Sequence, residues 1–159
     1  MTYIEILLSR SGVLAIIGAV ALFLPWHWAH FLAFVFLFNS FDVWGYKGVG
    51  KFEKGDEDGI KEYRLMQVMF QAIFVALIYQ MDGIPTAVAC MLGWWLLCCD
   101  VLFYFALGEK LTPFTWALWS PVNAIYKVVF KEPTPVWAVL TSAVIGLVVG
   151  LTITFVERY

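Results

Sequence analysis

The chain has 159 residues, of which 62% are hydrophobic and 14% are charged, and its mean hydropathy is +0.83. Soluble domains are about 45–50% apolar and about 25% charged, so this composition argues against an ordinary water-soluble globule. The formal net charge of −2, without a basic stripe, excludes a nucleic-acid-binding protein. The sequence predicts one all-α domain, residues 1–159, built as a polytopic membrane helical bundle.

Two apolar runs near the start of the chain predict a helical hairpin. Residues 3–10 are amphipathic and lead into residues 11–24, the first predicted span. Residues 25–30, PWHWAH, interrupt the pattern before the second span, residues 30–44. A single helix over both runs would be about 51 Å long, which exceeds the roughly 30 Å of a bilayer core, so a turn between them fits better.

A polar segment, residues 45–63, separates the second span from the third, which we place at residues 64–79. The polar segment is rich in Gly and in charges of both signs, and we expect a cytoplasmic surface loop with one helical turn. Gly45 to Lys51 matches G-x-x-x-x-G-K, but Phe52 stands where a phosphate-binding loop needs Ser or Thr. We therefore expect no phosphate-binding loop here.

The longest apolar run, residues 85–107, predicts a fourth span that carries one carboxylate, Asp100. A charge at that depth costs at least about 2.5 kcal/mol on insertion scales. We expect neighbouring helices to give Asp100 a partner, a proton or a wet cavity. Trp94 and Trp95 lie in the middle of this run, where they could line a groove for a pigment, a quinone or a lipid tail, or pack against another subunit.

Two further segments complete the predicted fold of about five transmembrane helices and one interfacial helix. Residues 112–131 contain two prolines and several aromatic residues, which favours an interfacial helix, with a broken or re-entrant span as the alternative. Residues 136–156 are apolar throughout and predict the last span.

Small residues repeat every four positions on the first and last predicted spans, and such stripes let helices approach closely. The residues are Ala15 and Ala19 on the first span and Ser142, Gly146 and Gly150 on the last. The last stripe is a G-x-x-x-G packing face, which could join this helix to its own bundle or to another subunit.

The basic residues predict the orientation. On the five-span topology, nine of the ten Lys and Arg residues fall on one side of the membrane, and Arg158 falls on the other. The positive-inside rule then places the N-terminus in the cytoplasm and predicts a plasma (inner) membrane protein. The C-terminus would also be cytoplasmic if residues 112–131 crossed the membrane.

Polar side chains of the second, third and fourth spans fall at a similar depth near the predicted cytoplasmic face. These binding-site or proton-site candidates are Asn39, Asp42, Arg64, Gln67, Gln71, Asp100 and Tyr104. Polar groups inside a membrane must find partners within the bundle. The alternative is a structural network in which Asp100 pairs with Arg64 or accepts hydrogen bonds. We expect Asp42, near the interface, to be solvated.

His27 and His30 lie three residues apart near the opposite interface, a spacing at which a helix could present two metal ligands. Asp82 is the nearest acidic residue, on the neighbouring outer turn, and a third ligand would have to come from another chain. Interfacial aromatic residues with incidental histidines are the simpler interpretation, so we predict no metal site.

The functional prediction is a small, non-catalytic integral membrane subunit that packs against lipids, partner membrane proteins or a second copy of itself. One alternative is a proton- or cation-coupled carrier or channel that uses Asp100. A third is a membrane enzyme that acts on a lipid substrate from the cytoplasmic side, but the sequence contains no protease or hydrolase motif. No pattern indicates a particular cofactor.

Overall fold

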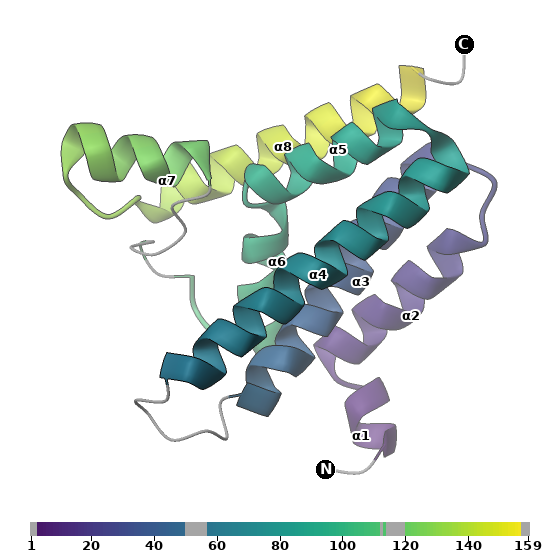
Figure 1. The fold of residues 1–159 in the computed structure, drawn as a ribbon, viewed down its shortest axis with the longest axis horizontal. Coiled ribbons are helices and arrows are strands. Elements are labelled where there is room, and N and C mark those ends of the chain that lie inside the picture. Colours follow the sequence, from purple (N-terminus) through teal and green to yellow (C-terminus); the bar gives the residue numbers. More distant parts are fainter. Residues whose placement is uncertain (1–2, 50–56, 112, 114–119, 157–159) are drawn as a thin grey trace.

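The computed structural model describes residues 3–49, 57–111, 113 and 120–156, which form helices and no strand. The helices are α1 (Tyr3–Leu7), α2 (Arg10–Leu22), α3 (His27–Val49), α4 (Glu57–Asp82), α5 (Ile84–Trp95), α6 (Cys98–Leu107), α7 (Pro121–Ile125), the π-helix η1 (Tyr126–Phe130) and α8 (Val136–Val156). In Figure 1, α2 runs along α3, α4 lies in front of α3, and α5 lies beside α8.

Helix α3 forms the centre of the bundle. Phe31, Phe34 and Phe38 recur every three or four residues on it, and all three are fully buried. The ring of Phe34 stacks on that of Phe38, with centroids 5.8 Å apart, and meets Phe74 of α4 edge-on at 6.5 Å. These close ring contacts give α3 its dense packing, because many weak dispersion contacts add up.

The small residues of α8 allow it to lie directly against α5 and α3. A Cβ atom added at Gly146 would come within 2.8 Å of Cβ of Leu96, and one added at Gly150 would overlap the ring of Phe31. Phe31 also closes on α5, because a Cβ atom at Gly93 would lie 3.0 Å from its Cε2. The ring of Phe31 therefore fills the junction of three helices.

The predicted fourth span is not one straight helix. Helices α5 and α6 are bent by 59°, and Leu97 between them is left-handed, with φ of 69°. That conformation costs a non-glycine residue roughly 1–2 kcal/mol. Leu97 is fully buried against Val139 of α8, and Ser142 of α8 donates a hydrogen bond to the Leu96 carbonyl at 3.0 Å. Contacts with α8 therefore hold a bend that no Gly or Pro between Trp94 and Cys99 marks in the sequence.

Within the described residues, two helices are long and apolar enough to cross a membrane, Glu62–Asp82 and Val136–Val156. The bent α5–α6 pair makes a third if it is one span, so the structure has fewer candidate spans than the five predicted. Helix α2 is too short, with 13 residues, because Ser9 caps its start and separates it from α1.

The structure also differs in detail from the prediction in the loop and in the interfacial segment. Helix α3 continues to Val49 and α4 begins at Glu57, so helix occupies much of the predicted loop 45–63. In the predicted interfacial segment 112–131, α7 and η1 form the described helical part, whereas residues 112 and 114–119 lie outside the described residues.

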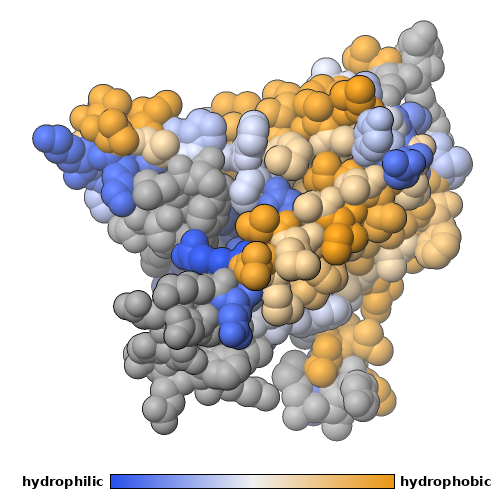
Figure 2. All heavy atoms as spheres, viewed as in Figure 1, coloured by the Kyte–Doolittle hydropathy of each residue, from blue (hydrophilic) through white to orange (hydrophobic). Residues whose placement is uncertain are grey.

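The outer surface of the bundle is largely apolar. Of the apolar window of Glu62–Asp82, 11% is buried, and of that of Val136–Val156, 33% is buried. In Figure 2, mostly apolar residues cover the visible face of α4 and the edge formed by α8. The exposed large apolar side chains of α4 include Leu65, Met69, Ile73 and Leu77, and those of α8 include Leu140, Val144, Ile145 and Val148.

Candidate functional site

The carboxylate of Asp42 joins α3 to α4. Its Oδ1 accepts hydrogen bonds from the hydroxyl of Tyr63 and from Nε2 of Gln67, the latter at 2.9 Å. Asp42 was expected to be solvated; it is half-buried, and α4 also supplies two hydrogen-bond donors to it. Sequence reasoning missed Tyr63, although it lies one helical turn before Gln67 and so on the same face of α4.

Asn39 lies one turn before Asp42 on α3 and is completely buried. Its Nδ2 donates a hydrogen bond to the carbonyl of Cys99 on α6, at 2.8 Å. Its Oδ1 is also buried and has no hydrogen-bond partner among the residues that the structure describes. The Asn39 amide is thus held between α3 and α6 with one acceptor unused.

Asp100 lies in the first turn of α6, next to the Cys99 carbonyl that Asn39 binds. Its carboxylate accepts a hydrogen bond from its own backbone N–H and interacts electrostatically with Asp42 and with Tyr63. Its Oδ2 is buried and, within the described part of the chain, unpartnered. The structure therefore brings Asn39, Asp42 and Asp100 together between α3 and α6.

Two other predicted members lie around this cluster. Arg64 is exposed on α4 and interacts electrostatically with its neighbour Tyr63. Tyr104 packs its ring edge-on against Phe103, with centroids 5.9 Å apart, and contacts the core around Leu97.

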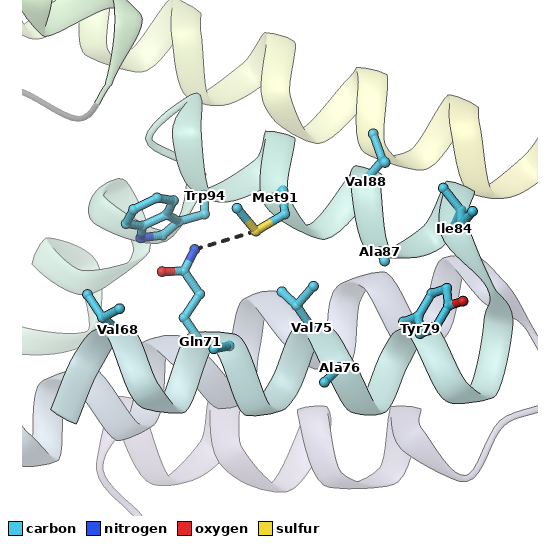
Figure 3. Close-up of a pocket in the computed structure, with 11 residues that line it drawn as sticks. Val68, Gln71, Val75, Ala76, Tyr79, Ile84, Ala87, Val88, Met91 and Trp94 are labelled. Carbon is cyan, nitrogen blue, oxygen red and sulfur yellow. Dashed lines mark hydrogen bonds between the residues drawn. The ribbon is translucent and has the colours of Figure 1, made fainter. Parts of the chain in front are cut away.

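Gln71 does not face the acidic cluster. It lines a cleft of about 710 Å³ between α4 and α5, where its Nε2 lies 3.8 Å from Sδ of Met91. Figure 3 shows Gln71 and Trp94 at one end of this cleft and Tyr79 and Ile84 at the other. Most other residues that line the cleft are apolar, and of the Trp pair expected to line a groove, Trp94 is among them and Trp95 is not.

The two histidines contact different partners near the turn between α4 and α5. Nδ1 of His30 donates to the carboxylate of Asp82, with both oxygens at 2.8 Å. Nδ1 of His27 lies 3.4 Å from the hydroxyl of Thr86. No group of three His, Cys, Asp or Glu side chains that could hold a metal ion occurs among the described residues.

The predicted packing residues are used differently on the two helices. Ser142, Gly146 and Gly150 are buried and face the protein's own helices α5 and α3. On α2, Ala15 is half-buried and Ala19 is exposed, whereas Gly18 is buried against Leu37 of α3.

Within its described residues, the structure supplies a half-buried acidic cluster and an apolar cleft. No family model, no curated protein and no solved structure matches the chain.

Proposed function

We propose that this protein is an integral membrane bundle with a non-catalytic role, in which lipid acyl chains cover the outer faces of α4 and α8. The observation that carries the proposal is the exposure of α4, of whose apolar window 11% is buried. In water, large apolar side chains exposed along two long helices would favour aggregation. In a bilayer the same side chains are solvated by hydrocarbon, and both helices have the length needed to span it.

The small residues of α8 pack inside the protein, and this favours lipid over another subunit as the neighbour of its outer face. Gly146 and Gly150 pack inside the bundle, so they do not supply a surface for another subunit. The outward side chains of α4 and α8 are instead large and apolar, such as Ile73 and Val144. Exposed apolar side chains of this kind are suited to contact with acyl chains, which form no hydrogen bonds.

Site-specific photo-crosslinking in native membranes tests what covers these helices. A benzophenone side chain at Ile73 or Val144 should give adducts with the mass of single lipids. The matched control is Val139 on α8, which is fully buried and should crosslink within the chain. Adducts with a second polypeptide would show instead that a partner protein covers these faces, and recovery of the chain in the soluble fraction would contradict the proposal altogether.

A second candidate function is a cation- or proton-coupled carrier or channel that uses Asp100. The observation that favours it is Oδ2 of Asp100, which is buried beside the bend at Leu97 and has no hydrogen-bond partner among the residues with a described position. Broken helices near buried charges are common in ion-coupled transporters, because the break leaves backbone groups available for ligands. Reconstitution in liposomes tests this function: sodium or proton flux should occur with the native chain and be abolished by Asp100→Asn.

A further inference from the structure

We propose that Asn39, Asp42 and Asp100 form a binding site for one small cation, an alkali-metal ion or a proton, between α3 and α6. The inference rests on the second proposed function for its location. It concerns binding rather than transport, and would stand if the protein bound the ion without moving it.

The first observation is that two buried oxygen atoms at this place have no donor among the described residues. They are Oδ1 of Asn39 and Oδ2 of Asp100, which come from facing helices. A buried acceptor without a partner costs about 1–3 kcal/mol. Because Asn39 is bonded to Cys99, the residue before Asp100, a single cation or a shared proton between α3 and α6 can interact with both acceptors.

The second observation is that the Asn39 amide is fixed in place. Its Nδ2 is bonded to the carbonyl of Cys99, the residue before Asp100. Asn39 is 0% exposed, so its free oxygen has no access to bulk solvent. The amide oxygen of Asn39 is therefore held beside the first turn of α6, the turn that carries Asp100.

The third observation is the charge balance. The carboxylates of Asp42 and Asp100 repel each other electrostatically. The two donors on Asp42, Tyr63 and Gln67, are neutral, so they do not cancel its charge. A bound cation would relieve this repulsion, and a site made of oxygen atoms suits alkali ions, which are hard cations, better than transition metals.

The ionisable groups that interact electrostatically with Asp100 are Asp42 of α3, Tyr63 of α4, and the neighbouring thiols Cys98 and Cys99 of α6. One step further away, Arg64 of α4 interacts with Tyr63 and Cys90 of α5 interacts with Cys99. Helix α8 also packs against α6 but has no ionisable residue in Val136–Val156. None of these groups is a histidine. The guanidinium of Arg10 on α2 donates a hydrogen bond to the Phe105 carbonyl further along α6, at 3.0 Å.

The test is the melting temperature of the full chain in lipid nanodiscs. At mildly alkaline pH, sodium, lithium or potassium chloride replaces choline chloride at constant ionic strength. An alkali ion that binds the native state should raise Tm by about 5–10 °C at a concentration about 100-fold above its Kd. The rise should be lost in Asp100→Asn and retained in Glu109→Gln, which removes an exposed carboxylate beyond the end of α6.

A pH titration in choline chloride alone shows whether the bound cation is a proton rather than an alkali-metal ion. If the proton is the ligand, Tm is insensitive to alkali ions and rises as the pH falls, because the native state takes up a proton that the unfolded state does not hold. This rise should also be lost in Asp100→Asn. If Asp100→Asn fails to fold, Asp42→Asn carries the same comparison.

The inference is overturned if Tm responds to neither ion nor pH, or if the response survives in both Asp variants. Flux measured on the same preparations separates this outcome from failure of the carrier proposal. Binding without flux, or flux that is unaffected by Asp100→Asn, contradicts the carrier proposal, whereas the binding site is decided by the Tm response and its loss in the Asp variants.

Discussion

Nδ1 of His30 lies 2.8 Å from both carboxylate oxygens of Asp82. Both side chains are nearly inaccessible, with 9% and 5% of their surface exposed. The contact ties the start of α3 to the end of α4, one residue before the tight turn at Gly83. It is therefore placed to fix the end of the bundle at which α4 and α5 reverse direction.

We expect Asp82→Asn to lower the free energy of unfolding by about 1.5–3 kcal/mol, the usual range for a hydrogen bond to a charged group. The change keeps the shape of the side chain and removes its charge. Thermal unfolding in detergent or nanodiscs measures the effect, with Glu132→Gln as the control because Glu132 is exposed. Equal stability of the two variants would show that the pair does not stabilise the fold.

Ser142 gives a second prediction, on the bend between α5 and α6. Its hydroxyl donates to the Leu96 carbonyl across two helices, so Ser142→Ala should cost about 0.5–1.5 kcal/mol. Thr152→Ala on the same helix is the matched control. Its hydroxyl donates to the Val148 carbonyl within α8 and is exposed, so its loss should leave stability nearly unchanged. The reverse order of the two variants would contradict the role assigned to Ser142.

The junction around Phe31 can be tested by a double-mutant cycle. Gly150→Ala places a methyl group against the Phe31 ring and should cost about 1–3 kcal/mol. Phe31→Leu removes the ring from this position, so Gly150→Ala should cost less stability in the Phe31→Leu background than in the native protein. Unfolding measurements should show a coupling energy of about 0.5–3 kcal/mol. Strictly additive effects would mean that the two residues do not share one space.

Lys131 is exposed and left-handed, with φ of 56°, at the end of η1. Glycine adopts this conformation without the steric cost that other residues carry. We therefore expect Lys131→Gly to raise the melting temperature, by an amount that corresponds to at most about 1–2 kcal/mol. Lys131→Ala, which keeps a Cβ atom, should not raise it, and a gain from alanine as large as that from glycine would refute the explanation.

The sequence was informative where one physical signal dominated. Helix α8 begins and ends at the residues predicted, because an unbroken apolar run is bounded by Pro135 and Glu157. The turn between α4 and α5, at Gly83, lies in the gap that the prediction left between the spans 64–79 and 85–107.

The features that could not be predicted depend on contacts between distant segments. The bend at Leu97 is stabilised by Val139 and Ser142, neither of which is close to it in sequence. In the same way, the direction in which Gln71 points depends on where α5 crosses α4. A helical pattern gives the face on which a residue lies, but not which neighbour occupies that side.

The bend at Leu97 has a mechanical consequence. Cys99 and Asp100 lie in the first turn of a short helix with its own axis, so a rotation at Leu97 would carry both residues together past Asn39. The pairing of α5 with α8 would stay intact during that motion, but the contacts of α6 with α8 would have to break. The packing of α6 on α8 therefore resists the rotation and keeps Asp100 at a fixed place beside α3.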